Sequence, residues 1–245
     1  MQTINFWIQY HFYWKKIAFL FLVLFTFSNA PAIAQNSSPI NLPDSDDKWL
    51  HFGYVIGGHL SSYKIRYSQE FIGPLQDTVQ SIQALNKPGF SMGILLNFRI
   101  AKYADLMLQP KFGLYEHELV YTYTAGREDH KQLVESSIVD FPVLLKYKSV
   151  RRGNIRMFMI GGVNPSLRVN GKKDDTEEKL QVNNTNLAVE YGFGADLYYP
   201  LFKLSPEIRF SHGLINLLSP EKNIYSKGLQ SLTAHSVTIY LIFSD

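Results

Sequence analysis

The residues with the widest chemical range in this chain are its histidines, because imidazole can bind a metal ion or exchange a proton near neutral pH. Beyond the first fifty positions they are His51, His59, His117, His130, His212 and His235. Two stretches combine a histidine with carboxylates, Glu116-His117-Glu118 and Glu128-Asp129-His130. The chain has no cysteine, so thiolate chemistry and disulfides are excluded. These two stretches are therefore the candidates for a metal site or a catalytic base.

Neither stretch has the spacing of a working site. On a regular strand, neighbouring side chains point to opposite faces, so His117 could not share a metal ion with Glu116 or Glu118. We expect His117 to lie at the rim of the fold instead. Residues 128–130 fall in a predicted loop without a second ligand pair at a recognised spacing. No zinc signature, phosphate-binding loop or nucleophile elbow occurs in the sequence. We expect no catalytic residue, no metal ligand and no cofactor.

The elements that carry these residues are predicted to be β-strands, because apolar residues recur at every second position. Between positions 90 and 100 the apolar residues alternate with small or polar ones. The same pattern returns at 106–114, 139–147, 155–163, 187–199, 204–210 and 237–243. It is weaker at 50–60, which contains three glycines. The sequence therefore predicts an all-β fold with eight antiparallel strands that close into a barrel.

Alternation alone does not say which face of such a barrel is inside, so the composition of the polar face has to decide. That face mixes charged residues with glycine, as at Gly93, Gly113 and Gly192. Glycine weakens a solvated strand but makes room for long side chains in a narrow lumen. We therefore expect a transmembrane barrel of the outer-membrane type, with its apolar face in lipid. The alternative is a soluble, lipocalin-like barrel with the apolar face inside.

The predicted lumen carries both signs of charge, and we expect these side chains to pair, because an unpaired buried charge is costly. The expected ion network consists of Arg99, Lys111, Asp140, Lys146, Arg156, Glu190, Asp196, Glu207 and Arg209. Eight strands enclose only enough space for their own inward side chains, so the lumen should be closed to diffusion. A small closed barrel would act by contact.

The connections between the predicted strands alternate in length. Short ones lie at 101–105, 149–153 and 200–202, and longer, hydrophilic ones at 61–87, 124–135, 165–184 and 212–231. Outer-membrane barrels have short periplasmic turns and longer external loops. The longer connections are therefore the predicted extracellular loops.

The first residues predict export. Lys15 and Lys16 precede an apolar run at 17–27, and Ala32-Ile33-Ala34 supplies small residues for cleavage after Ala34. Residues 1–34 are the expected signal peptide, 35–48 a polar leader and 49–245 the barrel. The long aromatic segment before Lys15 leaves a different start or an uncleaved anchor as alternatives. Cleavage would lower the formal net charge of +3 by two, and no basic stripe suggests nucleic acid.

Three stretches resemble the PorT family of outer-membrane proteins from Bacteroidetes-type bacteria. They are His51-Phe52-Gly53, residues 140–147 (DFPVLLKY) and residues 205–214 (SPEIRFSHGL). The resemblance implies an accessory role in type IX secretion, which moves folded cargo with a C-terminal sorting domain across the outer membrane and supports surface attachment or gliding. It implies other type IX secretion proteins as partners and no catalytic residue. The alternative is a stand-alone small barrel that binds a ligand or surface partner through its extracellular loops.

Overall fold

A computed structural model of the protein describes residues 39–68, 79–123, 130–169, 182–218 and 228–245. The expected signal peptide at 1–34 and the start of the polar leader lie outside these ranges. The residues from Ile40 onward form one compact unit. None of the helices in the described ranges is long and apolar enough to cross a membrane.

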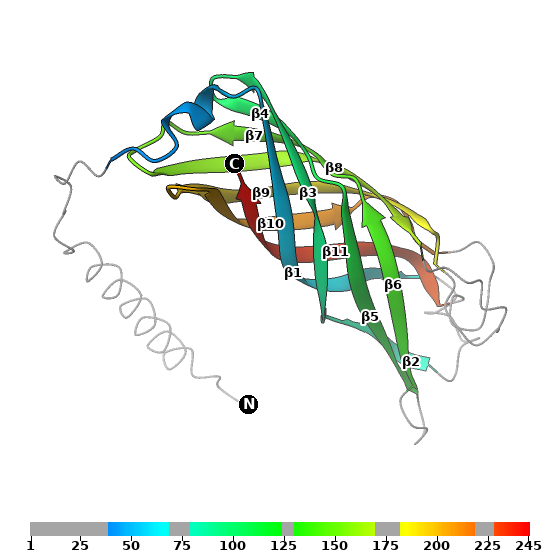
Figure 1. The fold of residues 1–245 in the computed structure, drawn as a ribbon. Coiled ribbons are helices and arrows are strands. Elements are labelled where there is room, and N and C mark those ends of the chain that lie inside the picture. Colours follow the sequence, from blue (N-terminus) through cyan, green and yellow to red (C-terminus); the bar gives the residue numbers. More distant parts are fainter. Residues whose placement is uncertain (1–38, 69–78, 124–129, 170–181, 219–227) are drawn as a thin grey trace, which may run out of the picture. The chain divides into compact units, whose positions relative to one another are not determined.

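The described residues of this unit form one antiparallel β-sheet of eleven strands, preceded by a short 3-10 helix (Figure 1). The helix is η1 (Pro43–Asp47). The strands are β1 (Leu50–Tyr67), β2 (Val79–Leu85), β3 (Lys87–Ala101), β4 (Ala104–Leu108), β5 (Lys111–Tyr123), β6 (His130–Asp140), β7 (Val143–Lys148), β8 (Ile155–Arg168), β9 (Thr185–Tyr198), β10 (Lys203–Gly213) and β11 (Leu229–Ser244). The all-β prediction is therefore confirmed, whereas the described strands number eleven rather than eight.

The higher count comes from interruptions within long strands. Asn86 separates β2 from β3, residues 109–110 separate β4 from β5, and residues 141–142 separate β6 from β7. Two of the interruptions contain a proline, which has no N–H to donate to a neighbouring strand. The backbone stays paired on the acceptor side, since Ile94 N donates to Pro110 O at 3.1 Å and Gln109 N to Pro142 O at 3.2 Å.

The strand order is β2-β5-β6-β8-β7-β4-β3-β1-β11-β10-β9, and β5 pairs in addition with β3 and β8 with β9. The first strand has partners on both sides, because His59 of β1 lies opposite Gly89 of β3 and opposite Thr238 of β11. β8 pairs with β9 from Ile155 to Leu167. Strands from the beginning and the end of the chain therefore lie side by side (Figure 1).

The strands are longer than the alternation predicted. β1 runs to Tyr67 instead of ending at position 60, and all of β2 lies within the predicted loop 61–87. β6 begins at His130, inside the predicted loop 124–135. β8 and β11 likewise extend into the predicted loops 165–184 and 212–231. These four loop assignments are thus partly wrong.

The physical reason is that the apolar side changes face along a strand. After Leu60, which is exposed, Tyr63 of β1 is buried and Ile65 is partly buried on the inner face, while Tyr67 at the strand end is exposed. Tyr63 and Ile65 join a second apolar cluster that holds the extended strand ends together. Its buried members are Tyr63, Ile82, Leu119, Tyr121, Leu217, Leu229 and Leu232. Apolar residues that point inward do not match the pattern expected of a lipid-facing strand. The strand ends were therefore predicted as loops.

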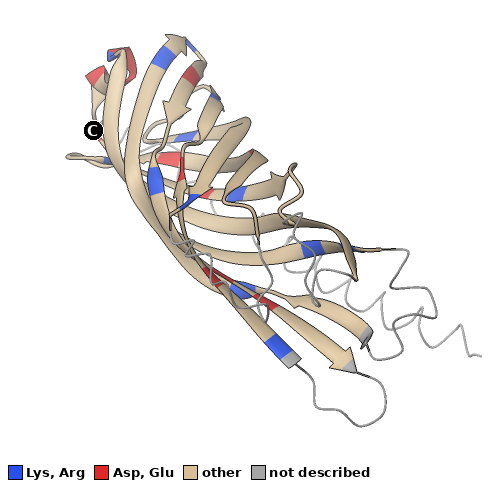
Figure 2. Cartoon of the chain, turned by 90° about the vertical axis from the view of Figure 1, so that its right-hand side faces the viewer, with Lys and Arg blue, Asp and Glu red and all other residues tan. Residues whose placement is uncertain are grey.

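The outer face of the sheet is apolar, as predicted. Side chains expected to face lipid are exposed by 47% for Ile94, 43% for Phe112, 38% for Val143 and 44% for Leu241. The soluble, lipocalin-like alternative required these residues to be inside, and it is wrong. Figure 2 shows that much of each strand carries no charge, and that red and blue segments lie close to one another at several places.

Candidate functional site

The inner face of the sheet, opposite the apolar outer face, holds most of the predicted ion network. Five of its nine residues form a central ionic cluster, defined as Lys111, Asp140, Glu190, Glu207 and Arg209. Each is at most 3% exposed. β5, β6, β9 and β10 contribute these side chains, so residues up to about a hundred positions apart meet in one cluster.

Arg209 is the most connected member of the central ionic cluster. Its Nε donates to Glu207 Oε1 at 2.6 Å, and its Nη1 donates to Glu190 Oε2 at 3.1 Å. Its Nη2 donates to Gln109 Oε1 at 2.8 Å. The guanidinium also lies over the Tyr240 ring, 4.4 Å from the centroid. Arg209 therefore links two carboxylates, an amide and an aromatic ring that come from β9, β10, β11 and the interruption between β4 and β5.

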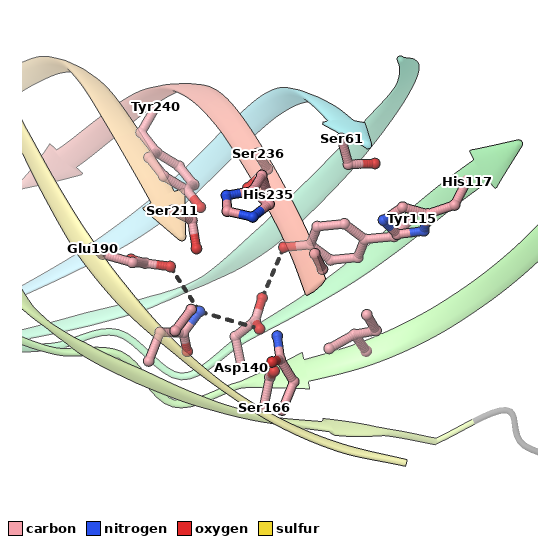
Figure 3. Close-up of a pocket in the computed structure, with 15 residues that line it drawn as sticks. Ser61, Tyr115, His117, Asp140, Ser166, Glu190, Ser211, His235, Ser236 and Tyr240 are labelled. Atoms are coloured by element: carbon pink, nitrogen blue, oxygen red, sulfur yellow. Dashed lines mark hydrogen bonds between the residues drawn. The ribbon is translucent and has the colours of Figure 1, made fainter. Parts of the chain in front are cut away.

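Asp140 and Glu190 are joined by a neutral amide. Asn164 Nδ2 donates to Glu190 Oε1 at 2.7 Å and to Asp140 Oδ1 at 3.3 Å, and Tyr115 OH donates to Asp140 Oδ2 at 2.9 Å (dashed lines in Figure 3). Lys111 Nζ lies 3.9 Å from an oxygen of each carboxylate and donates to Tyr240 OH at 2.6 Å. Asp140 thus depends on two neutral donors for its close hydrogen bonds.

An apolar layer separates the central ionic cluster from further charges. Its buried members are Val55, Leu95, Met107, Leu144, Phe158, Ile160, Tyr240 and Ile242. Gly57 leaves the space for the Tyr240 ring, because a Cβ at this position would collide with it. Lys146 Nζ lies 3.8 Å from the centroid of the Phe158 ring. Cations therefore lie on aromatic members of this layer, and the inner face is packed with apolar side chains as well as charges.

A second ionic group lies beyond the apolar layer. Lys146 Nζ donates to Asp196 Oδ1 at 2.7 Å, and both residues were predicted to be in the network. Lys148 Nζ lies 2.6 Å from Asp105 Oδ1, and Lys203 is buried close by. The sequence reasoning missed these last three, because it placed Asp105 in a turn and the two lysines at strand ends.

Arg99 and Arg156, the remaining predicted residues, contact η1. Arg156 donates to both carboxylate oxygens of Asp46, at 2.8 and 3.0 Å, and Tyr198 OH donates to Asp46 Oδ1 at 3.0 Å. Arg99 donates to the Asp46 carbonyl and to Asp47 Oδ1. Partial burial raises the pKa of Asp46, but the nearby charge of Arg156 and the Tyr198 hydrogen bond lower it by more. The net result is a pKa below the ordinary value of 3.8. What was predicted as a polar leader is thus an ionic partner of the sheet.

Two of the buried histidines of the inner face, His59 and His117, stack on tyrosine rings. His117 is only 3% exposed and stacks on Tyr63, with ring centroids 3.9 Å apart. His59 stacks on Tyr115 with centroids 4.0 Å apart. The expectation that His117 lies at the rim is therefore wrong. An inward position on β5 buries it, and a tyrosine on β1 covers its ring.

The other histidines are separate from these two. His51 Nδ1 lies 3.3 Å from Asp245 Oδ1 at the opposite end of β1. His212 and His235 are cross-strand neighbours, with their Nδ1 atoms 2.8 Å apart. His130 is the first residue of β6 and not part of a loop, while Glu128 and Asp129 fall outside the described residues. Among the residues that the structure describes, no group of three or more His, Cys, Asp or Glu side chains could hold a metal ion.

An antiparallel sheet with an apolar exposed face and an ionic buried face is the arrangement of an outer-membrane barrel-type protein. The sequence matches the family described as "Outer membrane protein beta-barrel domain" over residues 33–219, and the chain belongs to this family. The protein is therefore located in the outer membrane, where its apolar outer face lies against lipid.

Several solved structures are similar to this chain. Neisserial surface protein A shows 9% identity and a TM-score of 0.42, covering 78% of this chain and 95% of its own. OprG from Pseudomonas aeruginosa shows 11% identity and a TM-score of 0.43, covering 78% and 93%. The outer membrane protease OmpT from Escherichia coli shows 8% identity and a TM-score of 0.41, covering 80% and 95%. At these values the likeness carries no functional argument. No curated protein matches the chain.

Proposed function

We propose that this protein is a closed, eight-stranded barrel, exported with residues 1–34 as a cleaved signal peptide. The strand count follows if β2 with β3, β4 with β5 and β6 with β7 each act as one interrupted strand. The pairings β1–β11, β1–β3 and β8–β9 support closure. The first two give β1 a partner on each side, and the third joins β9, at the end of the strand order, back to β8. Closure also meets the requirement that no strand edge faces hydrocarbon.

The observation that carries the functional proposal is that successive layers of side chains fill the inner face. Asp46 binds Arg156 at one end, the layer around Leu144 and Phe158 follows, and the cluster around Arg209 lies beyond it. A barrel filled in this way is unsuited to pass solutes. We propose that the charges act as a structural network that holds the lumen shut. Its members are Arg99, Lys111, Asp140, Lys146, Arg156, Glu190, Asp196, Glu207 and Arg209.

A filled barrel acts through its surface, and we propose that this one is a non-enzymatic accessory component of type IX secretion. The resemblance of residues 51–53, 140–147 and 205–214 to the PorT family supports this role. The first stretch lies in β1, the second spans the β6–β7 interruption, and the third lies in β10 except for Leu214, which follows that strand. A narrow barrel could not itself pass folded cargo, so it would assist a larger translocon by contact with other secretion proteins.

A gene deletion tests this role. Proteomics of periplasm and medium should show cargo with a C-terminal sorting domain retained in the periplasm of the deletion strain, and the wild-type gene on a plasmid should restore its release. As a matched control, a periplasmic protein without a sorting domain should be unchanged in both strains. Normal release of sorting-domain cargo by the deletion strain would reject the role.

The alternative is a stand-alone barrel that binds a ligand or surface partner through extracellular loops. The second apolar cluster favours it, because Tyr63, Leu119 and Leu232 pack β1, β5 and β11 together where these strands extend past the charged interior. Strand ends packed in this way would provide a rigid support for a binding surface. Shortening the connections at 69–78 and 170–181 should then abolish surface adhesion while secretion stays intact. The reverse result favours the secretion role.

A further inference from the structure

A polar cavity of about 50 Å³ lies next to the central ionic cluster on the inner face (Figure 3). Asp140 and Glu190 form part of its wall, and Asn164, Asn186, Ser166 and His117 contribute further polar atoms. This volume exceeds the 10–15 Å³ or so that one water needs. It is therefore large enough for an ion with one or two waters.

Two amide oxygens of wall residues have no hydrogen-bond donor in the part of the chain that the structure describes. Asn164 is 5% exposed, and its Nδ2 donates to both Asp140 and Glu190, which fixes the orientation of the amide. A flipped amide would place its oxygen against two carboxylates. The Asn164 Oδ1 atom, and likewise Asn186 Oδ1, has no hydrogen-bond partner among the described residues. Buried acceptors of this kind are costly unless something binds them.

The charges beside the cavity are unbalanced. Three carboxylates, Asp140, Glu190 and Glu207, face two cations in the central ionic cluster, and the carboxylates that Arg209 pairs with are Glu190 and Glu207. Lys111 stays 3.9 Å from Asp140, beyond hydrogen-bond distance. Arg168, further along β8, interacts with Tyr63 and His117 and is not part of the cavity wall. Among the described residues Asp140 therefore has Lys111 at 3.9 Å as its ion-pair partner, and its hydrogen bonds come only from the neutral groups of Tyr115 and Asn164.

We propose that this cavity is a binding site for a small hard cation of the Na⁺ or Ca²⁺ type. Carboxylate, amide and hydroxyl oxygens are the ligands that such cations prefer. Asp140 and Glu190 supply carboxylate oxygens and Asn164 and Asn186 amide oxygens, from β6, β8 and β9. Both ring nitrogens of His117 also lack hydrogen-bond partners among the described residues, and they would bind waters carried by the ion. The site does not depend on the secretion role.

The test is an ion-specific change in stability. The full-length protein, folded in detergent micelles and stripped with a chelator, is melted in NaCl, CaCl₂ and choline chloride at equal ionic strength. Choline is too large for the cavity. Sodium or calcium, at about ten times its dissociation constant, should raise the melting midpoint by roughly 3–5 °C over choline.

Three variants separate this site from general salt effects. Glu190→Gln removes a proposed ligand, and Ala188→Met fills the cavity while leaving every charge in place, because Ala188 is a buried part of its wall. Both should lose the difference between salts. Glu135→Gln removes an exposed carboxylate of β6 and should keep it. If Glu190→Gln does not fold, Ala188→Met decides alone. Equal midpoints of the wild type in all three salts, or a full response in Ala188→Met, would overturn the proposal.

Discussion

Replacing Arg209 with methionine should destabilise this protein by about 3–5 kcal/mol, the usual cost of removing one partner of a buried ion pair. Arg209 is 1% exposed and pairs with Glu190 at 3.1 Å and with Glu207 at 2.6 Å. Methionine has a similar volume but no guanidinium, so most of the space stays filled while both carboxylates lose their strongest donor. Lys111 Nζ donates to Tyr240 OH at 2.6 Å and lies 3.9 Å from Glu190 Oε1, so in this position it does not replace the lost hydrogen bonds.

The assay is the loss of heat-modifiable gel mobility, together with urea unfolding in micelles. At about 2–4 °C per kcal/mol, the melting midpoint should fall by roughly 6–20 °C. The double variant Arg209→Met, Glu207→Leu should recover part of this loss, because it removes one stranded carboxylate. Lys131→Met, at an exposed position of β6, should stay within about 0.5 kcal/mol of the wild type. An unchanged midpoint for Arg209→Met would refute the reasoning that these charges are buried and mutually dependent.

Three further predictions concern the leader, the apolar layer and the lipid face. Because the pKa of Asp46 is lowered on docking, the η1 contact should be present above pH 3.8 and be lost as the pH falls below it. Limited proteolysis near η1 should therefore accelerate in acid. The Asp46→Asn variant should be cleaved fast at every pH. Leu144→Ala should cost about 2–5 kcal/mol in urea unfolding, since Leu144 is fully buried, and a wild-type curve would contradict the packing described. Ile94→Arg should reduce folding into lipid vesicles by about 2–4 kcal/mol if Ile94 lies near the bilayer midplane, whereas equal yields would place it outside the membrane.

The sequence by itself determined the face on which most strand residues lie. Alternation is local, since neighbouring side chains of a strand point to opposite sides whatever the strand pairs with. The outward positions of Ile94 and Phe112 and the inward ones of Lys111 and Arg209 were therefore predictable. The same reasoning failed beyond Leu60, because there the apolar residues of β1 belong to the buried face, and local alternation does not say which face is in lipid.

Only the tertiary structure decided which charges meet. Asp46 and Arg156 are 110 positions apart, and Lys148 and Asp105 belong to different strands. Their contacts depend on the register between strands and on where a leader docks, and a one-residue shift in register would send each side chain to the other face. The position of the Asn164 amide between two carboxylates likewise depends on how the strands pair. The side of the sheet on which a residue lies is set within its own strand, whereas the residue with which it pairs is set by the assembled sheet.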